Sequence, residues 1–423
     1  GAPVPSPCGI TFCSVLRCML WPGSVNPAFF FKPRLSEAIH LFTHEENDVM
    51  TTAWKPQHLQ QLRVLDENVL PVFVPADRVS PSAESYFWDF WPVLTESGEL
   101  AEIDGTELWM SLSAPRNGDP DQRHHLARLH FHTRRSGVWQ DRGHLLPSGF
   151  TLGSHEWSGS AIYYPENREL RLFYTMVGES RSPGPSYVQG LAQACGTVVT
   201  TPAGISVVDW REQTESVPSD GQFYAVADQV EGEAGFIKAF RDPYYFLDPA
   251  SGNPYLMFTA SVANPTSRFA GAIGIAEADG HTGYPWRRCP SLFEADGVNN
   301  ELERALIIYH DDLYYLFWST QQRTFSPDCA APTGLYGAVS SSIMGPYQPL
   351  NDSGLVLSNP VSAPSQCYAW QVMPDLRVIS FIDHVPTAPA TAAAGQDLPA
   401  THAFVGTVAP EVHLRLAGDR TQL

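Results

Sequence analysis

The sequence predicts an antiparallel all-β fold, and three observations carry that prediction. The 423 residues include 32 Gly and 36 Pro, a turn-forming composition that suits many short strands better than long helices. Short runs rich in β-branched and aromatic side chains recur along the chain, bounded by Gly, Pro, Asn or Asp. No helical periodicity separates these runs. Regular strands without helices between them are typical of a β-propeller or a β-sandwich.

The chain divides into an irregular start and one long strand-rich domain. Residues 1–45 show no lasting period and are expected to form an irregular N-terminal segment, whereas residues 46–423 are expected to form a single domain. A short helix is expected at Pro56–Val64, and the low-complexity stretch Pro386–Ala400 is expected to be a flexible surface loop. The expected strands are Glu107–Leu112, Leu126–His132, Ser160–Tyr164, Glu169–Val177, Pro254–Ser261, Ala270–Ala276, Ala305–His310, Leu313–Thr320, Gly334–Ser340, Arg377–Asp383 and Glu411–Ala417.

The composition argues against two classes of protein. Asp and Glu number 45 against 26 Lys and Arg, which gives a net charge of −19. Because phosphate binding needs clustered cations, no nucleic-acid partner is expected. No apolar run reaches the ~18–20 residues that a membrane-spanning helix requires, so no membrane association is expected. At 43% hydrophobic residues the chain can bury a sizeable core, and we expect a soluble globular protein.

The seven cysteines do not indicate a metal site. Three of them, Cys8, Cys13 and Cys18, crowd the first twenty residues, and the others are scattered. The chain contains no Cys-x-x-Cys pair and no Cys/His spacing typical of zinc. Small buried cysteines, some of them joined in one or two disulfides, are therefore expected rather than metal ligands.

The segment Tyr86–Pro92 places Asp89 inside a cluster of aromatic residues. A carboxylate in such a cluster is partly desolvated, which shifts its pKa and suits a nucleophile that faces a sugar. The alternative interpretation is an ordinary strand end with a capping Asp.

Two further segments place carboxylates next to arginine. In Phe240–Tyr245 the adjacent Arg241 and Asp242 would point to opposite faces of a strand, but a turn before the proline would let both address one pocket. In Asn300–Arg304 the period of two puts Glu301 and Glu303 on one strand face, where one pKa is raised as a general acid requires. The alternatives are a structural Arg-Asp-Pro turn and a solvated charge cluster.

The three segments together match the needs of glycoside cleavage. A retaining glycosidase uses a carboxylate nucleophile and a carboxylic acid about 5 Å apart. The chain also carries 11 Trp, 16 Tyr and 22 Phe, which supply stacking surfaces for sugars. Four motifs stand out along the chain: Trp88-Asp89-Phe90-Trp91-Pro92, Glu156-Trp157-Ser158-Gly159-Ser160, Phe240-Arg241-Asp242-Pro243 and Glu301-Leu302-Glu303-Arg304. They occur in the order seen in glycoside hydrolase family 68, which holds the levansucrases, inulosucrases and related β-fructofuranosidases. Residues 50–420 resemble this family.

The resemblance implies a fold and three catalytic roles. The fold is a single five-bladed β-propeller with a central active-site funnel. Asp89 is expected to be the nucleophile that forms a covalent fructosyl-enzyme from sucrose. Glu303 is expected to be the acid/base that protonates the departing glucose, and Asp242 to stabilise the transition state. Fructose would then pass to water or to sugar acceptors, giving free fructose, short fructo-oligosaccharides or fructan.

The resemblance also implies a set of substrate-binding residues. Trp88 and Trp157 would wall the fructosyl pocket, and Ser158 would donate a hydrogen bond to the nucleophile. The remaining shell would consist of Arg241, Glu301, Arg304 and Tyr368. On the acceptor side, Gln321 occupies the place where polymer-forming relatives carry Arg or His, so a growing chain would be held less firmly. The alternative is that Arg323 supplies this cation instead.

No cofactor and no metal are expected. The calcium-binding members of the family carry an Asp six residues before the stabiliser, and that position is Phe236 here. Sucrose and fructosyl acceptors are the expected partners, and the substrate suggests an extracellular or periplasmic, secreted enzyme. Two other functions remain open at this point: a non-catalytic propeller that binds glycans, and a hydrolase of preformed fructans.

Overall fold

The computed structural model of the chain describes residues 49–120, 123–179, 186–219, 221–228, 233–279, 285–387 and 402–423. The expected irregular segment 1–45, with Cys8, Cys13 and Cys18, lies outside this part, as does nearly all of the expected loop Pro386–Ala400. Across the described residues, no helix combines the length and the apolar character needed to cross a bilayer.

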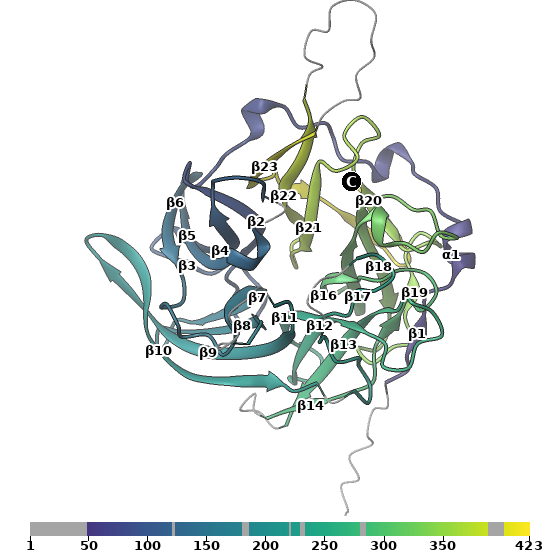
Figure 1. Cartoon of the computed structure of the whole chain (residues 1–423), viewed down its shortest axis with the longest axis horizontal. Coiled ribbons are helices and arrows are strands. Elements are labelled where there is room, and N and C mark those ends of the chain that lie inside the picture. Colours follow the sequence, from purple (N-terminus) through teal and green to yellow (C-terminus); the bar gives the residue numbers. More distant parts are fainter. Residues whose placement is uncertain are drawn as a thin grey trace, which may run out of the picture. The chain divides into compact units, whose positions relative to one another are not determined.

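Five sheets, antiparallel except where β1 joins β15, surround a common centre as the blades of a β-propeller, which confirms the predicted fold class (Figure 1). In chain order the first two blades are β2 (Ser85–Pro92), β4 (Thr106–Pro115), β5 (Arg128–Arg135) and β6 (Val138–His144) with β3 (Glu102–Ile103), then β7 (His155–Tyr164), β8 (Glu169–Val177), β9 (Gln189–Thr201) and β10 (Gly204–Val217). The third blade is β11 (Phe240–Leu247), β12 (Pro254–Ser261), β13 (Gly271–Ala278) and β15 (Phe293–Glu294), extended by β14 (Trp286–Arg288) and by β1 (Thr52–Ala53). The last two are β16 (Glu303–His310), β17 (Leu313–Thr320), β18 (Gly334–Ser340), β19 (Gln348–Pro349) and β20 (Leu355–Ser358), then β21 (Cys367–Val372), β22 (Arg377–Pro386), β23 (His402–Val408) and β24 (Val412–His413).

The short elements depart most from expectation. Helix α1 spans only Pro56–Gln60, because Leu59 is its one buried side chain and no apolar face extends it towards Val64. The expected strand Glu411–Ala417 is divided into β24 and β25 (Arg415–Ala417), which pairs with β26 (Arg420–Gln422). The division falls at Leu414, which is buried and donates its backbone N–H to Leu376 instead.

The innermost strand of every blade carries a β-bulge at the same point along its length. The register shifts after Trp88 in β2, Trp157 in β7, Arg241 in β11, Glu303 in β16 and Tyr368 in β21. In four of the five strands the residue that follows has a positive φ: 47° at Asp89, 57° at Asp242, 54° at Arg304 and 52° at Ala369. A bulge turns side chains away from the simple alternation of a strand. At the bulge, each inner strand therefore turns towards the centre side chains that would otherwise point to a face of its sheet.

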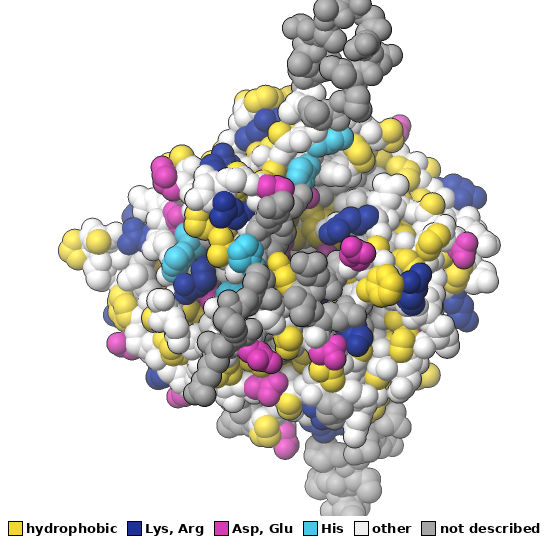
Figure 2. Space-filling model, viewed as in Figure 1, with side chains coloured by type: hydrophobic (Ala, Val, Ile, Leu, Met, Phe, Trp, Pro, Cys, Tyr) yellow, Lys and Arg dark blue, Asp and Glu magenta, His cyan; other side chains and the backbone are white. Residues whose placement is uncertain are grey.

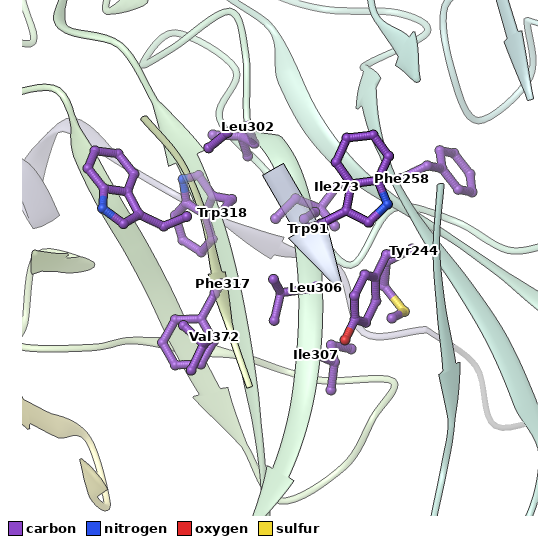
Figure 3. Close-up of a cluster of buried hydrophobic side chains, with 14 of the residues drawn as sticks. Trp91, Tyr244, Phe258, Ile273, Leu302, Leu306, Ile307, Phe317, Trp318 and Val372 are labelled. Carbon is purple, nitrogen blue, oxygen red and sulfur yellow. The ribbon is translucent and has the colours of Figure 1, made fainter. Parts of the chain in front are cut away.

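Beyond the bulges the same strands close the centre with apolar side chains. Trp91 of β2, Tyr244 of β11, Leu306 of β16 and Val372 of β21 are all buried. Figure 3 shows these four side chains in one cluster with neighbours from β12, β13 and β17. The apolar core thus fixes the positions at which the bulged residues are displayed.

The segment before the first blade is tied to the third and fourth. Strand β1 pairs in parallel with β15, and Trp54 donates its Nε1–H to the Ser353 carbonyl at 2.9 Å. Its ring packs edge-on against Trp318 and Tyr336, with centroids 5.4 and 5.3 Å apart. The described cysteines, Cys195, Cys289, Cys329 and Cys367, are buried thiols with no disulfide among them.

Candidate active site

Asp89 lies at the bulge of β2 and keeps partial contact with solvent. Ser158, on the neighbouring inner strand β7, donates its hydroxyl to Asp89 Oδ2 at 2.6 Å. Burial raises the pKa of the Asp89 carboxyl, while the Arg304 guanidinium and the Ser158 hydroxyl act to lower it and the Glu303 charge raises it further. The carboxylate is therefore positioned by a short hydrogen bond and still open on one side.

Asp242 is almost fully enclosed, with 5% of its surface exposed. Its Oδ2 accepts hydrogen bonds from the Thr259 hydroxyl at 3.1 Å and from the Arg304 backbone N–H at 3.3 Å, and its own N–H donates to Thr175 Oγ1 at 2.9 Å. Burial raises the pKa of Asp242 to about 6, against the opposing charges of Arg241 and Arg304. The expected turn before Pro243 is in fact the β11 bulge, and it turns Asp242 towards the centre.

Arg241 joins the two glutamates of the fourth blade. Its Nη2 donates to Glu301 Oε1 and, at 3.0 Å, to Glu303 Oε1, while its Nη1 donates to Gln189 Oε1 at 3.2 Å. Burial and the Glu303 charge raise the pKa of Glu301 to about 7. Glu301 precedes strand β16 rather than sharing a strand face with Glu303, so the shared arginine brings the pair together, not the period of two.

Glu303 is held from a second side by the fifth blade. The Tyr368 hydroxyl donates to Glu303 Oε2, the oxygen that Arg241 leaves free. Burial, with the nearby Glu303 charge, raises the pKa of Tyr368 well above its usual value, so the phenol remains a donor. The Glu303 side chain is 17% exposed against 9% for Glu301. Asp89 and Glu303 are thus the carboxylates of this group that reach solvent.

Arg304 braces the site from behind. Its Nη1 donates to the Gly159 carbonyl at 2.9 Å, and its guanidinium carbon lies 4.6 Å from the centre of the Trp91 ring. The resemblance places Arg304 in the shell that binds sugar and orients the acid/base, and its described contacts also join three blades. Gly159 itself is required by space, because a Cβ there would lie 1.9 Å from the Phe173 carbonyl oxygen.

The two expected tryptophan walls stand on adjacent inner strands. Trp88 is 6% exposed, and its ring centroid lies 5.4 Å from that of Phe404. Trp157 is partly exposed, with its ring 5.7 Å from that of Tyr187. Both residues directly precede the side chains that form the Asp89–Ser158 hydrogen bond. Charged side chains of both signs surround the centre of the face shown in Figure 2.

Gln321 and Arg323 contact each other at the edge of the group. Arg323 Nε donates to Gln321 Oε1 at 2.5 Å, and the Arg323 charge acts against the burial that raises the pKa of Glu301. Arg323 is exposed and Gln321 is partly exposed, so both face solvent. The structure therefore places the Arg323 guanidinium beside Gln321.

A narrow gap with no room for a water molecule is lined by Asp242, Tyr244, Arg304, Ala305, Leu306, Trp370 and Gln371. Neither Asp89 nor Glu303 lines it. This gap is too small for a sugar, so we expect the sugar on the side where those two side chains meet solvent.

Several supporting residues escaped the sequence analysis. Thr175 and Thr259 hold Asp242 from second strands, and Gln189 holds Arg241 from β9. Hydroxyl and amide residues on strands carry no pattern that separates these contacts from ordinary surface positions. His130 and His132 were also missed, although their spacing of two on an expected strand puts both rings on one face.

Paired carboxylates held by arginine and tyrosine at the centre of a five-bladed propeller define a glycoside hydrolase. The chain belongs to the levansucrase/invertase family, glycoside hydrolase family 68, whose sequence model matches residues 43–270 and 266–423. It is 31% identical to a levansucrase of Rahnella aquatilis, over 88% of this chain and 93% of that protein.

Solved structures are similar over the same region. An inulosucrase from Halalkalicoccus jeotgali bound to kestose matches with a TM-score of 0.78 and 33% identity, covering 88% of this chain and 95% of that one. The full-length β-fructofuranosidase of Microbacterium saccharophilum K-1 matches with a TM-score of 0.76 and 26% identity, covering 89% and 83%.

Proposed function

We propose that this enzyme is a retaining fructosyltransferase that cleaves sucrose through a covalent fructosyl-enzyme. One observation carries the proposal: Asp89, Asp242 and Glu303 each lie at the bulge of a different inner strand. They lie close enough together that the charges of Asp89 and Glu303 raise the pKa of Asp242. Family membership and similarity to levansucrases and an inulosucrase support the same substrate class.

The first half-reaction uses the two carboxylates that reach solvent. An oxygen of Asp89 attacks the anomeric carbon of the fructosyl unit and forms an ester bond. The bond from that carbon to the glucosyl oxygen breaks, and the oxygen takes a proton from Glu303, so glucose leaves as a neutral sugar. Arg241 and Tyr368 hold both Glu303 oxygens and thereby fix the direction from which the proton is delivered.

The second half-reaction returns both groups to their starting state. Glu303, now ionised, accepts a proton from water or from an acceptor hydroxyl, whose oxygen attacks the anomeric carbon and displaces Asp89. Two inversions give net retention of configuration. Asp242 stabilises the positive charge that develops on the fructosyl ring in both steps. Because its pKa is about 6, this stabilisation is lost as the solution becomes more acidic than that.

The acceptor side is governed by Gln321 and Arg323 in this proposal. A guanidinium can give an acceptor sugar charge-assisted hydrogen bonds, roughly twice as strong as those of a neutral amide. Arg323 is tied to Gln321, so its reach is limited to acceptors that bind near that amide. We propose that short fructo-oligosaccharides and free fructose dominate over long fructan. An extracellular or periplasmic location, where sucrose is met before uptake, is proposed on the same substrate logic.

Glucose release from sucrose, set against fructose release from inulin and levan, tests the function. The parent protein should release glucose from sucrose faster than it releases fructose from either polymer. Asp89→Ala should abolish glucose release. Asp312→Ala is the matched control, since Asp312 also has a positive φ (61°); it should not affect release, because Asp312 lies exposed in the β16–β17 turn. Greater release from inulin or levan would favour a hydrolase of preformed fructan. Binding of these sugars without any turnover would favour a non-catalytic glycan-binding propeller.

A further inference from the structure

Two histidines and an aspartate of the first blade meet on one face of the sheet. His130 and His132 alternate along β5, and Asp141 lies opposite His132 on β6. The Nδ1 atoms of His130 and His132 are 3.0 and 3.5 Å from Asp141 Oδ1, and the three ligand atoms lie within 4.8 Å of one another. The Gly143 backbone N–H donates to the same Asp141 oxygen at 3.0 Å and fixes its place.

One nitrogen of the buried His132 ring forms no hydrogen bond with the described residues. The side chain is 0% exposed, and its Nε2 shares a 2.7 Å hydrogen bond with the Ser111 hydroxyl. Its Nδ1 has no hydrogen-bond partner among the described residues, although it lies 3.5 Å from Asp141 Oδ1. A buried polar atom without a hydrogen bond costs about 1–3 kcal/mol. If Nε2–H donates to Ser111, a lone pair on Nδ1 faces a carboxylate oxygen. The two electron-rich atoms repel each other, and a cation between them would remove that repulsion.

The chemistry of the donors selects the kind of cation. Two imidazole nitrogens and one carboxylate oxygen are ligands of zinc-type transition metals, whereas calcium and magnesium prefer oxygen alone. Bonds of about 2.0–2.2 Å at tetrahedral angles separate ligand atoms by roughly 3.3–3.6 Å. The spacings to Asp141 Oδ1 are 3.0 and 3.5 Å, and the three ligand atoms lie within 4.8 Å of one another, so a bound ion would draw them together. A metal-bound imidazole commonly donates its other ring N–H to an oxygen, and Ser111 stands at that place for His132.

The cluster lies directly behind the strand that carries Asp89. The Phe87 ring packs against both imidazoles, with centroids 5.9 Å from His130 and 5.2 Å from His132, and Phe90 packs 5.6 Å from His132. These two phenylalanines flank Trp88 and Asp89 in β2. An exposed neighbour, His144, packs 4.8 Å from His130 and marks the solvent side.

We propose that His130, His132 and Asp141 bind one divalent transition-metal ion of the zinc type, which clamps β5 to β6 behind the nucleophile strand. The site is distinct from the carboxylates that act on the sugar. Its role is to stiffen the first blade, so binding raises the unfolding temperature. In the competing arrangement, which holds no metal, His130 Nδ1–H donates to Asp141 Oδ1 at 3.0 Å, Ser111 donates to His132 Nε2, and a protonated His132 Nδ1 faces the same oxygen.

Titration of the full chain, stripped with EDTA and then dialysed, separates the two arrangements. With Co²⁺ as probe, the parent should bind one equivalent and develop visible d–d absorption without a thiolate charge-transfer band, which separates this site from cysteine ligation. Zn²⁺ should displace the Co²⁺ and raise the unfolding temperature. Asp141→Asn and His130→Gln should lose the absorption, and Ser111→Ala should weaken binding about 10- to 100-fold.

The matched control is His413→Gln, which removes an exposed histidine of β24 and should bind as the parent does. Circular dichroism verifies that each variant is folded. If His130→Gln does not fold, the test relies on Asp141→Asn. The proposal is overturned if the parent gives no d–d absorption, if the absorption carries a thiolate band, or if Asp141→Asn binds as tightly as the parent.

Discussion

Replacing Ser158 with alanine tests how the nucleophile is kept ready to react. The Ser158 hydroxyl donates to Asp89 Oδ2 at 2.6 Å, and burial raises the pKa of that carboxyl. The hydrogen bond favours the ionised form and opposes burial, so its loss should move the acid limb of the pH profile of kcat/KM to higher pH. Hydrogen bonds to charged groups contribute about 1.5–3 kcal/mol, which corresponds to a fall of roughly 10- to 150-fold on the acid limb. Because Asp89 keeps partial contact with water, we expect the lower end of that range.

The assay is initial-rate glucose release from sucrose across the acid and neutral pH range. Ser113→Ala is the matched control: Ser113 is 1% exposed, lies on the paired strand β4, and its hydroxyl has no hydrogen-bond partner among the described residues. The control should leave the profile where it is. An unshifted acid limb in Ser158→Ala, or an equal shift in Ser113→Ala, would refute this account of how Asp89 is held.

Three other outcomes follow from the same geometry. Glu303→Gln should remove the alkaline limb and most turnover of sucrose, while a fructosyl donor with a good leaving group is partly spared; equal loss on both donors would mean that Glu303 is not the acid. Asp242→Asn should inactivate the enzyme yet stabilise it by about 3 kcal/mol above pH 6, because the folded pKa of about 6 exceeds the usual 3.8, and denaturant titrations should show the gain vanish as pH falls through that window. Gln321→His should lengthen the fructan products and Arg323→Gln should shorten them, as size-resolved product analysis at high sucrose can show; abundant polymer from the parent would contradict the expected short products.

The strand pattern was sufficient to predict the class of fold but not its arrangement in space. Glu169–Val177 and Leu313–Thr320 coincide with β8 and β17, because a long apolar run flanked by turn residues has few alternatives. Periodicity alone left propeller and sandwich open. The number of blades came from the motif resemblance, since the blades share no repeated sequence by which they could be counted.

The identity of the site residues was accessible from the motifs, whereas the reason they converge was not. Strand alternation would send Arg241 and Asp242 to opposite faces, and only the bulge after Arg241 turns both towards the centre. A positive φ at a non-glycine residue leaves no mark in the sequence, so the same device in β2, β16 and β21 could not be predicted. The contact of Arg304 with Gly159 joins residues far apart in the chain, so its place between blades could not be predicted from the sequence.

The central claim is that Asp89 carries a fructosyl unit between the two half-reactions. The direct measurement is rapid acid quenching of Glu303→Gln with a fructosyl donor that has a good leaving group, followed by intact-protein and peptide mass spectrometry. Without its base, this variant should return the intermediate to water slowly, so the adduct should accumulate. The account predicts the added mass of one hexosyl unit on the peptide that contains Asp89, and none in the Asp89→Ala, Glu303→Gln double variant. Steady release of the leaving group with no adduct, or an adduct on any other residue, would contradict it.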